Sequence, residues 1–244
     1  MVETIVSGEI LRTIARAIVA LVSECRIHFL SKGLHSRAVD PSNVAMVIVD
    51  VPKDSIESYR VDVEKTIGVD INRIFEISKT IGSKDLVEVS ILDETSLRIK
   101  FGSVEYNIAL IDPSAIRKEP KIPELNLPAK IVLDAGEFKK AISATEKISE
   151  NVVLKSDKHG FTIEAKGDIE RITFTMTGSE LIEFNGGEAR SMFSIDYLRE
   201  FCKVAGAGDL LTISLGTNYP GRFSFELVGG KVRVEYILAP RVES

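Results

Sequence analysis

The apolar and polar positions of this chain follow two different periods. In four windows, residues 9–22, 70–82, 136–148 and 194–205, apolar side chains recur every three or four residues, which is typical of amphipathic helices. Between these windows the apolar residues alternate with polar ones or are β-branched, which favours strands. The predicted strands cover residues 4–6, 26–30, 34–39, 45–51, 65–69, 86–91, 96–101 and 104–110 in the first half and 152–155, 161–165, 171–176, 210–215, 222–227 and 231–237 in the second.

The links between neighbouring strands are mostly too short for parallel crossovers, so antiparallel sheets are expected. Hairpin turns are predicted at residues 32–33 and 102–103, and the two glycines of residues 228–231 indicate a two-residue turn there. Gly82 is expected to end the second helix. The sequence therefore predicts an α+β fold with two β-α-β-β-β units in each half and two helices packed on one side of the sheets.

The two halves of the chain repeat each other. Three pairs of segments correspond at offsets of 128, 124 and 127 residues, namely 8–14 with 136–142, 69–74 with 193–198 and 110–113 with 237–240. Similar offsets at three separate places indicate two copies of one domain. Between the copies, residues 112–128 hold four of the eight prolines and no apolar period, which is typical of an extended linker. We predict domains at residues 1–116 and 130–244, joined by a connector at 117–129.

Composition and charge exclude several classes of protein. The net charge of −5 lacks the basic excess of a conventional nucleic-acid-binding protein. Two cysteines supply neither a disulfide framework nor a zinc site, and a reducing cytoplasm is the simplest compartment for such a chain. Residues 1–10 carry two glutamates and no basic residue, which argues against a signal peptide, and the apolar run at 17–22 is too short to span a membrane.

No motif of catalysis is present in the sequence. Asp40 lies near His28 and His35, but these residues have neither metal-ligand spacing nor a catalytic-triad pattern. The glycine-rich residues 206–208 follow a helix and do not open one, so helix termination is favoured over phosphate binding. The chain is therefore expected to be no enzyme and to use no cofactor or metal.

Basic residues on the predicted helices are more informative than the total charge. Arg12 and Arg16, and again Arg199 and Lys203, are four residues apart, which places each pair on one helical face. Residues 9–22, 70–82, 136–148 and 194–206 together carry a net charge of +2, so the rest of the chain carries −7. Recurrence on equivalent helices favours a shared basic surface over independent solvated faces.

Several segments resemble one known family over the whole length of the chain. These are the helix SGEILRTIARAI at residues 7–18, the segment DPSNV at residues 40–44 and the ending LAP at residues 238–240. Together they resemble proliferating cell nuclear antigen, the sliding DNA clamp, and the short loops resemble its archaeal branch. The resemblance implies a ring of three subunits, alike or related, in which helices line a central hole and antiparallel sheets lie outside.

The same resemblance implies partners and a location. The ring would encircle double-stranded DNA without reading its sequence, which suits a sparse basic lining. DNA polymerase, the clamp loader, flap endonuclease and DNA ligase would bind through short PIP-box peptides. Such a clamp would be cytoplasmic and associated with the nucleoid of an archaeal cell.

The resemblance also implies three sets of functional residues. The expected DNA contacts are Arg12, Arg16, Arg73, Lys79, Lys139, Lys140, Lys147, Arg199 and Lys203. The expected peptide-binding residues are Val39, Asn43, Val44, Met46, Ile122, Leu125, Leu127, Pro220, Ile237, Ala239 and Pro240. The expected subunit interface pairs the strand with Val104, Tyr106, Ile108 and Leu110 with the strand with Ile172, Phe174 and Met176.

Three other functions compete with that of a general replication clamp. The first is a specialised, clamp-like checkpoint ring subunit, and the second is a two-domain scaffold that binds only protein. The third belongs to a different class, a hydrolase that uses Asp40 with a nearby histidine.

Overall fold

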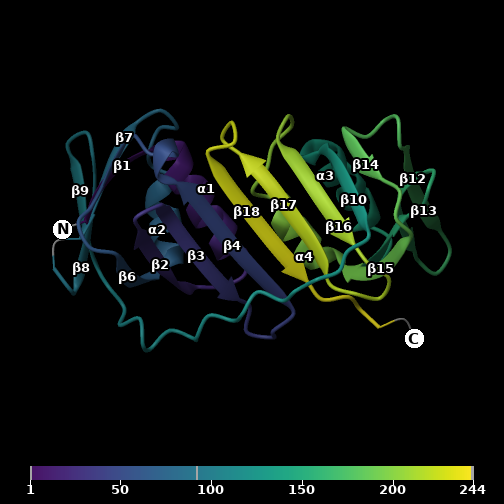
Figure 1. The fold of residues 1–244 in the computed structure, drawn as a ribbon, viewed down its shortest axis with the longest axis horizontal. Coiled ribbons are helices and arrows are strands. Elements are labelled where there is room, and N and C mark those ends of the chain that lie inside the picture. The colour runs from purple at the N-terminus through teal and green to yellow at the C-terminus, as the bar shows by residue number, and fades with distance from the viewer. Residues whose placement is uncertain (1, 92, 243–244) are drawn as a thin grey trace. The chain divides into compact units, whose positions relative to one another are not determined.

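The computed structural model describes residues 2–91 and 93–242, so the predicted domain limits at residues 1 and 244 lie outside the described residues. The chain divides into two compact units (Figure 1). The first comprises residues 1–121 together with 227–234, and the second comprises residues 122–226 together with 235–244.

The first unit contains two helices and two antiparallel sets of strands. Helix α1 (Gly8–Val19) packs against helix α2 (Ile71–Ser78). One sheet has the order β5-β1-β7-β8-β9, formed by Ser58–Val61, Val2–Ser7, Leu86–Ile91, Ser96–Phe101 and Val104–Ala109. The other set has the order β6-β2-β3-β4, formed by Lys65–Asp70, Glu24–Leu30, Gly33–Val39 and Ala45–Pro52. A short 3-10 helix, η1 (Lys53–Ser55), follows β4.

The second unit has the same arrangement with different residues. Helix α3 (Ala135–Thr145) packs against helix α4 (Ile195–Cys202). One set of strands has the order β14-β10-β16-β17-β18, formed by Glu183–Asn185, Ala129–Asp134, Leu210–Leu215, Gly221–Leu227 and Val232–Leu238. The end of β17 and the start of β18 fall within residues 227–234, which are grouped with the first unit. The four-stranded sheet has the order β13-β12-β11-β15, formed by Arg171–Thr177, Gly160–Lys166, Asn151–Ser156 and Ala189–Ser194.

These strand orders confirm the predicted α+β class and the internal repeat. Every strand of the first unit has a counterpart at the same place in the second, including β5 and β14, two short strands that the sequence pattern did not predict. The strands at Ala129–Asp134 and Ala189–Ser194 were not among the predicted ones. The internal repeat implied both, because strands were predicted at the equivalent positions of the first half. The predicted β-α-β-β-β units are therefore correct, with one extra short strand in each half.

The burial of side chains corrects the register of the repeat at the first helix. Leu11 and Ile18 of α1 are buried, and the buried residues of α3 that match them are Phe138 and Thr145. Each pair is 127 residues apart, and so are Gly8 and Ala135, which begin the two helices. The offset of 128 predicted from the Gly-Glu pairs was therefore wrong by one residue, whereas the offset of 124 between α2 and α4 is confirmed.

Side-chain caps fix the starts of three helices. The Ser7 hydroxyl accepts a hydrogen bond from the Ile10 N–H at 3.3 Å, and the Asp70 carboxylate accepts one from the Arg73 N–H at 3.1 Å. The Asp134 carboxylate accepts two, from Gly136 at 2.8 Å and from Glu137 at 3.2 Å. Such caps satisfy backbone donors that have no partner within the helix, so polar residues at these positions set where each helix begins.

The two units fill equivalent cores with different side chains. The largest fully buried residues of the first unit are isoleucines, among them Ile10 and Ile71. Those of the second unit are aromatic, and the rings of Phe201 and Tyr236 stack with centroids 4.0 Å apart. Burial of a large apolar side chain contributes about 2–3 kcal/mol whichever type is used, so one fold accommodates both cores.

Two predicted turns differ in detail from the structure. The pairing of Leu30 with Gly33 places the first hairpin turn at residues 31–32, one residue earlier than predicted. The turn between β17 and β18 spans residues 228–231, in which Val228, Gly229 and Gly230 all have positive φ angles. This four-residue turn replaces the predicted two-residue one. The predicted turn at residues 102–103 is confirmed, with Gly102 at φ 53°.

Helix α2 ends at Ser78, four residues before the predicted glycine. The glycine that the local packing requires is Gly8, because a Cβ atom added there would lie 2.3 Å from the Gly82 carbonyl oxygen. The absence of a side chain on Gly8 lets the start of α1 approach the loop that follows α2. The last carbonyl groups of α2 are capped instead by a side chain of α1.

Candidate nucleic-acid and partner interfaces

Arg12, an expected DNA contact, caps helix α2. Its guanidinium donates from Nε and Nη2 to the Ser78 carbonyl oxygen, each at 3.1 Å, and Nη2 also donates to the Ile81 carbonyl oxygen. Nη1 lies 3.4 Å from the Ser83 hydroxyl. Carbonyl groups at a helix C-terminus carry partial negative charge and lack partners within the helix. The structure therefore gives Arg12 a structural role that the sequence prediction missed.

The other basic residues of the first unit surround two aromatic rings. The Arg16 guanidinium lies 5.6 Å and the Lys79 ammonium 4.6 Å from the centre of the Phe75 ring. The Arg73 guanidinium lies 6.0 Å from the ring of Tyr106 in β9. Arg16, Arg73 and Lys79 are exposed. Helix α2 therefore carries its charges at the surface, and Arg73 connects it to the edge strand β9.

Several lysines of the helices pair with a glutamate one turn earlier. Lys140 Nζ lies 2.5 Å from the Glu137 carboxylate, and Lys203 Nζ lies 2.6 Å from that of Glu200. Lys79 Nζ lies 2.5 Å from the carboxylate of Glu76. Surface pairs at this spacing contribute little to stability, but they reduce the net field of the helix face.

Arg199 and two lysines complete the expected DNA-binding set in the second unit. Arg199 forms an ion pair with Glu146, at the C-terminal end of α3, and lies 3.4 Å from the carboxylate of Asp196. Hydrogen bonding and the negative charge of Glu146 raise the pKa of Arg199, which keeps it protonated. Lys139 and Lys147 are exposed, and neither lies within ion-pair distance of an acidic group among the described residues. Their charges are therefore the most available to an external phosphate.

Each unit has one edge strand among the predicted interface residues. Strand β9 pairs with β8 alone, and β13 pairs with β12 alone, within the described part of each unit. Val104 is 41% exposed, and Tyr106, Ile108, Leu110, Ile172 and Phe174 are half-buried, whereas Met176 is buried. An edge strand with a neutral, apolar face has little protection against pairing with another chain.

The register of these strands identifies which backbone groups face outward. The Leu110 N–H donates to Thr95 at 2.7 Å, so the alternate residues Tyr106 and Ile108 also direct their N–H and C=O groups toward β8. The N–H and C=O groups of Glu105, Asn107 and Ala109 face away from the sheet. In β13 the Gly178 N–H donates to the His159 carbonyl oxygen at 3.0 Å. The backbone N–H and C=O groups of residues 173, 175 and 177 therefore face outward.

The peptide-binding residues expected in the first unit surround the loop between β3 and β4. The buried Asp40 carboxylate accepts hydrogen bonds from the Val44 and Ala45 N–H groups, both at 2.7 Å, and from Ser42 at 3.1 Å. Asn43 is exposed at φ 58°. Val39 and Val44 are half-buried and Met46 is 8% exposed. The loop is thus fixed by one carboxylate and presents Asn43 and two valines.

The remaining expected peptide-binding residues lie in the second unit. Ile122 is 42% exposed, and Leu125, Leu127, Pro220, Ala239 and Pro240 are half-buried, whereas Ile237 is 5% exposed. A Cβ atom on Gly216 would lie 3.5 Å from a methyl group of Leu127, so this part of the connector packs near the β16–β17 loop. Among the described residues, no hydrogen bond joins 120–128 to the rest of the chain. Apolar side chains on such a free segment form an accessible surface.

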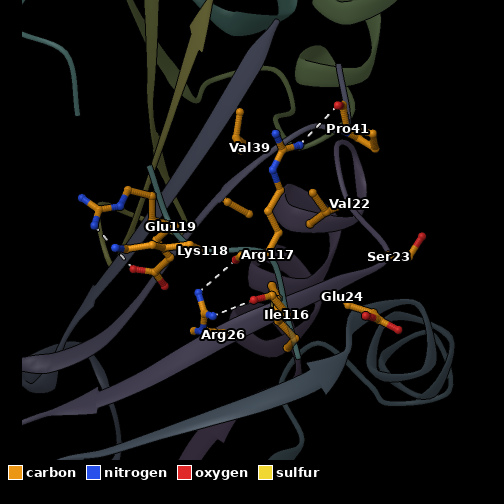
Figure 2. Close-up of a pocket in the computed structure, with 13 residues that line it drawn as sticks. Val22, Ser23, Glu24, Arg26, Val39, Pro41, Ile116, Arg117, Lys118 and Glu119 are labelled. Carbon is orange, nitrogen blue, oxygen red and sulfur yellow. Dashed lines mark hydrogen bonds and ion pairs between the residues drawn. The ribbon is translucent and has the colours of Figure 1, made fainter. Parts of the chain in front are cut away.

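The first half of the connector is held much more firmly, a feature that the sequence prediction missed. Arg26 in β2 donates four hydrogen bonds of 2.6–2.9 Å to the carbonyl oxygens of Pro113, Ile116 and Arg117. Figure 2 shows the bonds from Arg26 to Ile116 and Arg117. Arg117 in turn donates to the Asp40 carbonyl oxygen at 3.0 Å and to that of Pro41 at 3.2 Å. The linker predicted at residues 112–128 therefore has a fixed half, residues 113–119, and a free half, residues 120–128. We call these the fixed and free halves of the connector.

Glu119 also anchors the connector through side chains. His28 Nε2 lies 2.5 Å from the Glu119 carboxylate, and Arg37 Nη2 lies 3.4 Å from it. Burial by itself raises the pKa of Glu119. The hydrogen bond and charge of His28 and the charge of Arg37 have a larger, opposite effect, so the pKa of Glu119 is lowered. Glu119 therefore remains ionised at neutral pH.

This geometry argues against hydrolysis by Asp40 and a histidine. His28 is engaged by Glu119, and His35 Nδ1 lies 2.8 Å from the Asp50 carboxylate. The Asp40 carboxylate is buried and accepts from backbone N–H groups. Burial raises the pKa of the thiols of Cys25 and Cys202 to about 12, which disfavours reactive thiolates. The described residues contain no group of three His, Cys, Asp or Glu side chains that could hold a metal ion.

None of the helices among the described residues is both long and apolar enough to span a membrane.

Comparison with known proteins agrees with the fold. The family model described as proliferating cell nuclear antigen, N-terminal domain, matches residues 1–106, and the one for the C-terminal domain matches residues 121–241. The chain is 73% identical over 244 residues to the DNA polymerase sliding clamp of Archaeoglobus fulgidus, with all of both chains covered. It is 43% identical to that of Methanothrix thermoacetophila, with 100% of this chain and 99% of that one covered.

A solved structure gives the same result. The structure of A. fulgidus PCNA bound to the C-terminal region of FEN-1 matches this chain with a TM-score of 0.98 at 73% identity, and all of both chains are covered. The class of protein is therefore that of the DNA sliding clamps, which are processivity factors and not enzymes. The chain belongs to the proliferating cell nuclear antigen family. The predicted family, fold and absence of catalytic activity are confirmed by this membership.

The capping role of Arg12 can be tested by thermal and denaturant unfolding. Arg12→Met keeps the aliphatic stem and removes the donors to Ser78 and Ile81, so we expect the free energy of unfolding to fall by about 2–3 kcal/mol. Lys139→Met is the matched control, because it removes one charge from an exposed helical position and should change stability by less than about 0.5 kcal/mol. Equal stability of the two variants would show that the cap contributes nothing.

Proposed function

We propose that this chain is one subunit of a closed three-subunit ring that encircles duplex DNA and tethers DNA polymerase and other replication and repair enzymes. The observation that carries the proposal is the pair of open edges, β9 in one unit and β13 in the other. A chain with one such edge in each half can pair head to tail with its copies until the ring closes. Membership of the sliding-clamp family supports this assignment.

The proposed interface joins β9 of one subunit to β13 of the next. Its apolar contacts come from the side chains named for it in the sequence, which are Val104, Tyr106, Ile108, Leu110, Ile172, Phe174 and Met176. Its backbone contacts come from the outward-facing groups of residues 105, 107 and 109 and of residues 173, 175 and 177. Pairing between subunits would satisfy these groups and cover the half-buried side chains.

Assembly can be tested at a single outward-facing N–H group. Asn107→Pro removes one donor to the neighbouring subunit but none to β8, so the sheet of the subunit should survive. We expect ring dissociation constants to rise about tenfold or more, measured by sedimentation velocity over a concentration series. Asn107→Ala keeps the N–H group and should assemble as the wild type does. If the proline variant also assembled normally, β9 would not be the interface.

We assign the DNA contacts to the exposed basic residues of the four helices. These are Arg16, Arg73, Lys79, Lys139, Lys140, Lys147 and Lys203, together with the half-buried Arg199. We leave Arg12 out of the proposed contacts, because its guanidinium caps α2. Ion pairs within the helices reduce the charge available to phosphates. A weak, sequence-independent attraction of this kind would hold DNA in the hole while allowing the ring to slide.

The DNA assignment predicts a change in salt dependence. Lys139→Ala with Lys147→Ala removes one exposed charge of α3 and one from the turn that follows it, so the slope of log affinity against log salt should become shallower by roughly one unit per lost phosphate contact. Binding to nicked circular DNA, measured as a function of salt, gives this slope. Lys130→Ala with Lys231→Ala removes the same charge from strand and turn positions and should leave the slope unchanged. Identical slopes for both variants would contradict the assignment.

Partner proteins would dock on the free half of the connector. The apolar side chains of Ile122, Leu125 and Leu127, together with Pro220, Ala239 and Pro240, offer a surface for the aliphatic and aromatic anchors of a PIP-box peptide. Asn43, Val39 and Val44 offer a second surface in the first unit, whereas Met46 and Ile237 are buried. DNA polymerase, the clamp loader, flap endonuclease and DNA ligase would be the clients. The relative bound to the C-terminal region of FEN-1 supports this class of partner.

We place the domain limits of this clamp at residues 1–116 and 130–244, with the connector at 117–129. Association with DNA would place the clamp at the nucleoid within the cytoplasm.

A further inference from the structure

A groove of 280 Å³ lies in the first unit where the fixed half of the connector crosses β2 and β3. Figure 2 shows the side chain of Arg117 extending across it, with Val22 and Val39 on either side and Ile116 below. We call this site the connector groove. It is lined by Val22, Ser23, Glu24, Cys25, Arg26, Arg37, Ala38, Val39, Pro41, Ile116, Arg117, Lys118 and Glu119.

The connector groove is positively charged although the whole chain is negatively charged. Its lining includes four basic side chains, Arg26, Arg37, Arg117 and Lys118, and only two acidic ones, Glu24 and Glu119. In the described part of the chain, Arg26 and Arg117 donate hydrogen bonds only to carbonyl and amide oxygens. No carboxylate of the described residues lies within 4.0 Å of either guanidinium. Their charges are held in place by neutral partners and remain uncompensated.

The single carboxylate paired within the groove is shared between His28 and Arg37. Glu119 lies 2.5 Å from His28, and its other oxygen lies 3.4 Å from Arg37, which is a long contact for an ion pair. The Nε–H of Arg37 is buried and has no hydrogen-bond partner among the described residues. A buried donor without a partner is unfavourable, so the guanidinium of Arg37 is incompletely paired within the chain.

We propose that the connector groove binds a carboxylate side chain of a client peptide, so that this clamp prefers clients with Asp or Glu beside their apolar anchors. The inference rests on the proposed docking of such peptides on the connector. Lys118 and Arg37 would attract the carboxylate, and Arg26 and Arg117 would supply the surrounding positive field.

Two features favour a peptide over a phosphate as the occupant. The groove is continuous with the docking surface proposed in the first unit, because Val39 belongs to both. Its walls are also apolar at Val22, Val39 and Ile116, which suits the methylene groups of an acidic side chain better than a sugar-phosphate backbone. A client bound to the surface of the first unit would therefore lie beside the groove.

The test compares two charge forms of one peptide. The parent peptide comes from the C-terminal region of the FEN-1 of the same cell. Three residues, either all Glu or all Gln, are added at its amino end or at its carboxyl end, which gives four peptides. With wild-type clamp we expect the Glu form to bind about fivefold more tightly than the Gln form at one of the two ends, measured by fluorescence anisotropy at low salt. In Lys118→Gln and in Arg37→Gln this preference should fall below about twofold.

Matched variants separate failure of the groove from failure of the docking surface. Lys121→Gln removes an exposed connector lysine outside the groove and should retain the preference. Leu125→Ala with Pro240→Ala should weaken the Glu and Gln forms alike, by about thirtyfold. Equal affinity for the two forms at both ends would overturn the groove proposal and leave the docking surface intact.

Two further results would also overturn the proposal. If no form of the peptide bound, or if the Leu125 and Pro240 variant bound normally, the docking surface itself would be wrong and the groove would fall with it. If Lys118→Gln weakened binding to duplex DNA and left the peptide preference unchanged, the groove would be a phosphate contact instead.

Discussion

Burial of two helices against antiparallel sheets is the constraint from which the surfaces of each unit follow. Ile10 and Ile71 fill this layer in the first unit, and Phe138 and Phe201 fill it in the second. Once one face of each helix is buried, the opposite face must carry the polar and basic residues. Once the sheets are formed, β9 and β13 are left with one unpaired side. The two properties that the proposed ring requires, a polar helix face and open edges, therefore come from one packing arrangement.

Local patterns in the sequence predicted most of this arrangement. Helical and strand periods located the four helices and the main strands, and the internal repeat showed that the two halves share one fold. Those patterns missed β5 and β14, since strands of three or four residues carry too few positions to show a period. The slip of one residue at α1 arose because the Gly-Glu pair repeats in sequence although the buried positions do not follow it.

Long-range contacts were beyond the reach of the sequence. Arg12 and Ser78 are 66 residues apart, and nothing near Arg12 indicates that it caps another helix. Arg26 and Pro113 are 87 residues apart, so the division of the connector into a fixed and a free half was equally invisible. Both arginines bind carbonyl oxygens, which every residue type provides and which therefore leave no trace in a sequence pattern. The sequence shows where the basic residues are. Only the structure shows that Arg12 is held by hydrogen bonds to α2, whereas Lys139 is exposed.

Encirclement of DNA is the central claim of this account, and topology tests it most directly. The purified chain, at a concentration where it assembles, is loaded onto nicked circular DNA and the bound fraction is followed after one cut linearises the circle. A ring held by closure, and only weakly by its sparse basic lining, should remain on the circle and be lost by sliding off the ends of the linear DNA. Equal retention on circular and linear DNA would contradict the account, because it would show that direct contacts and not closure hold the protein.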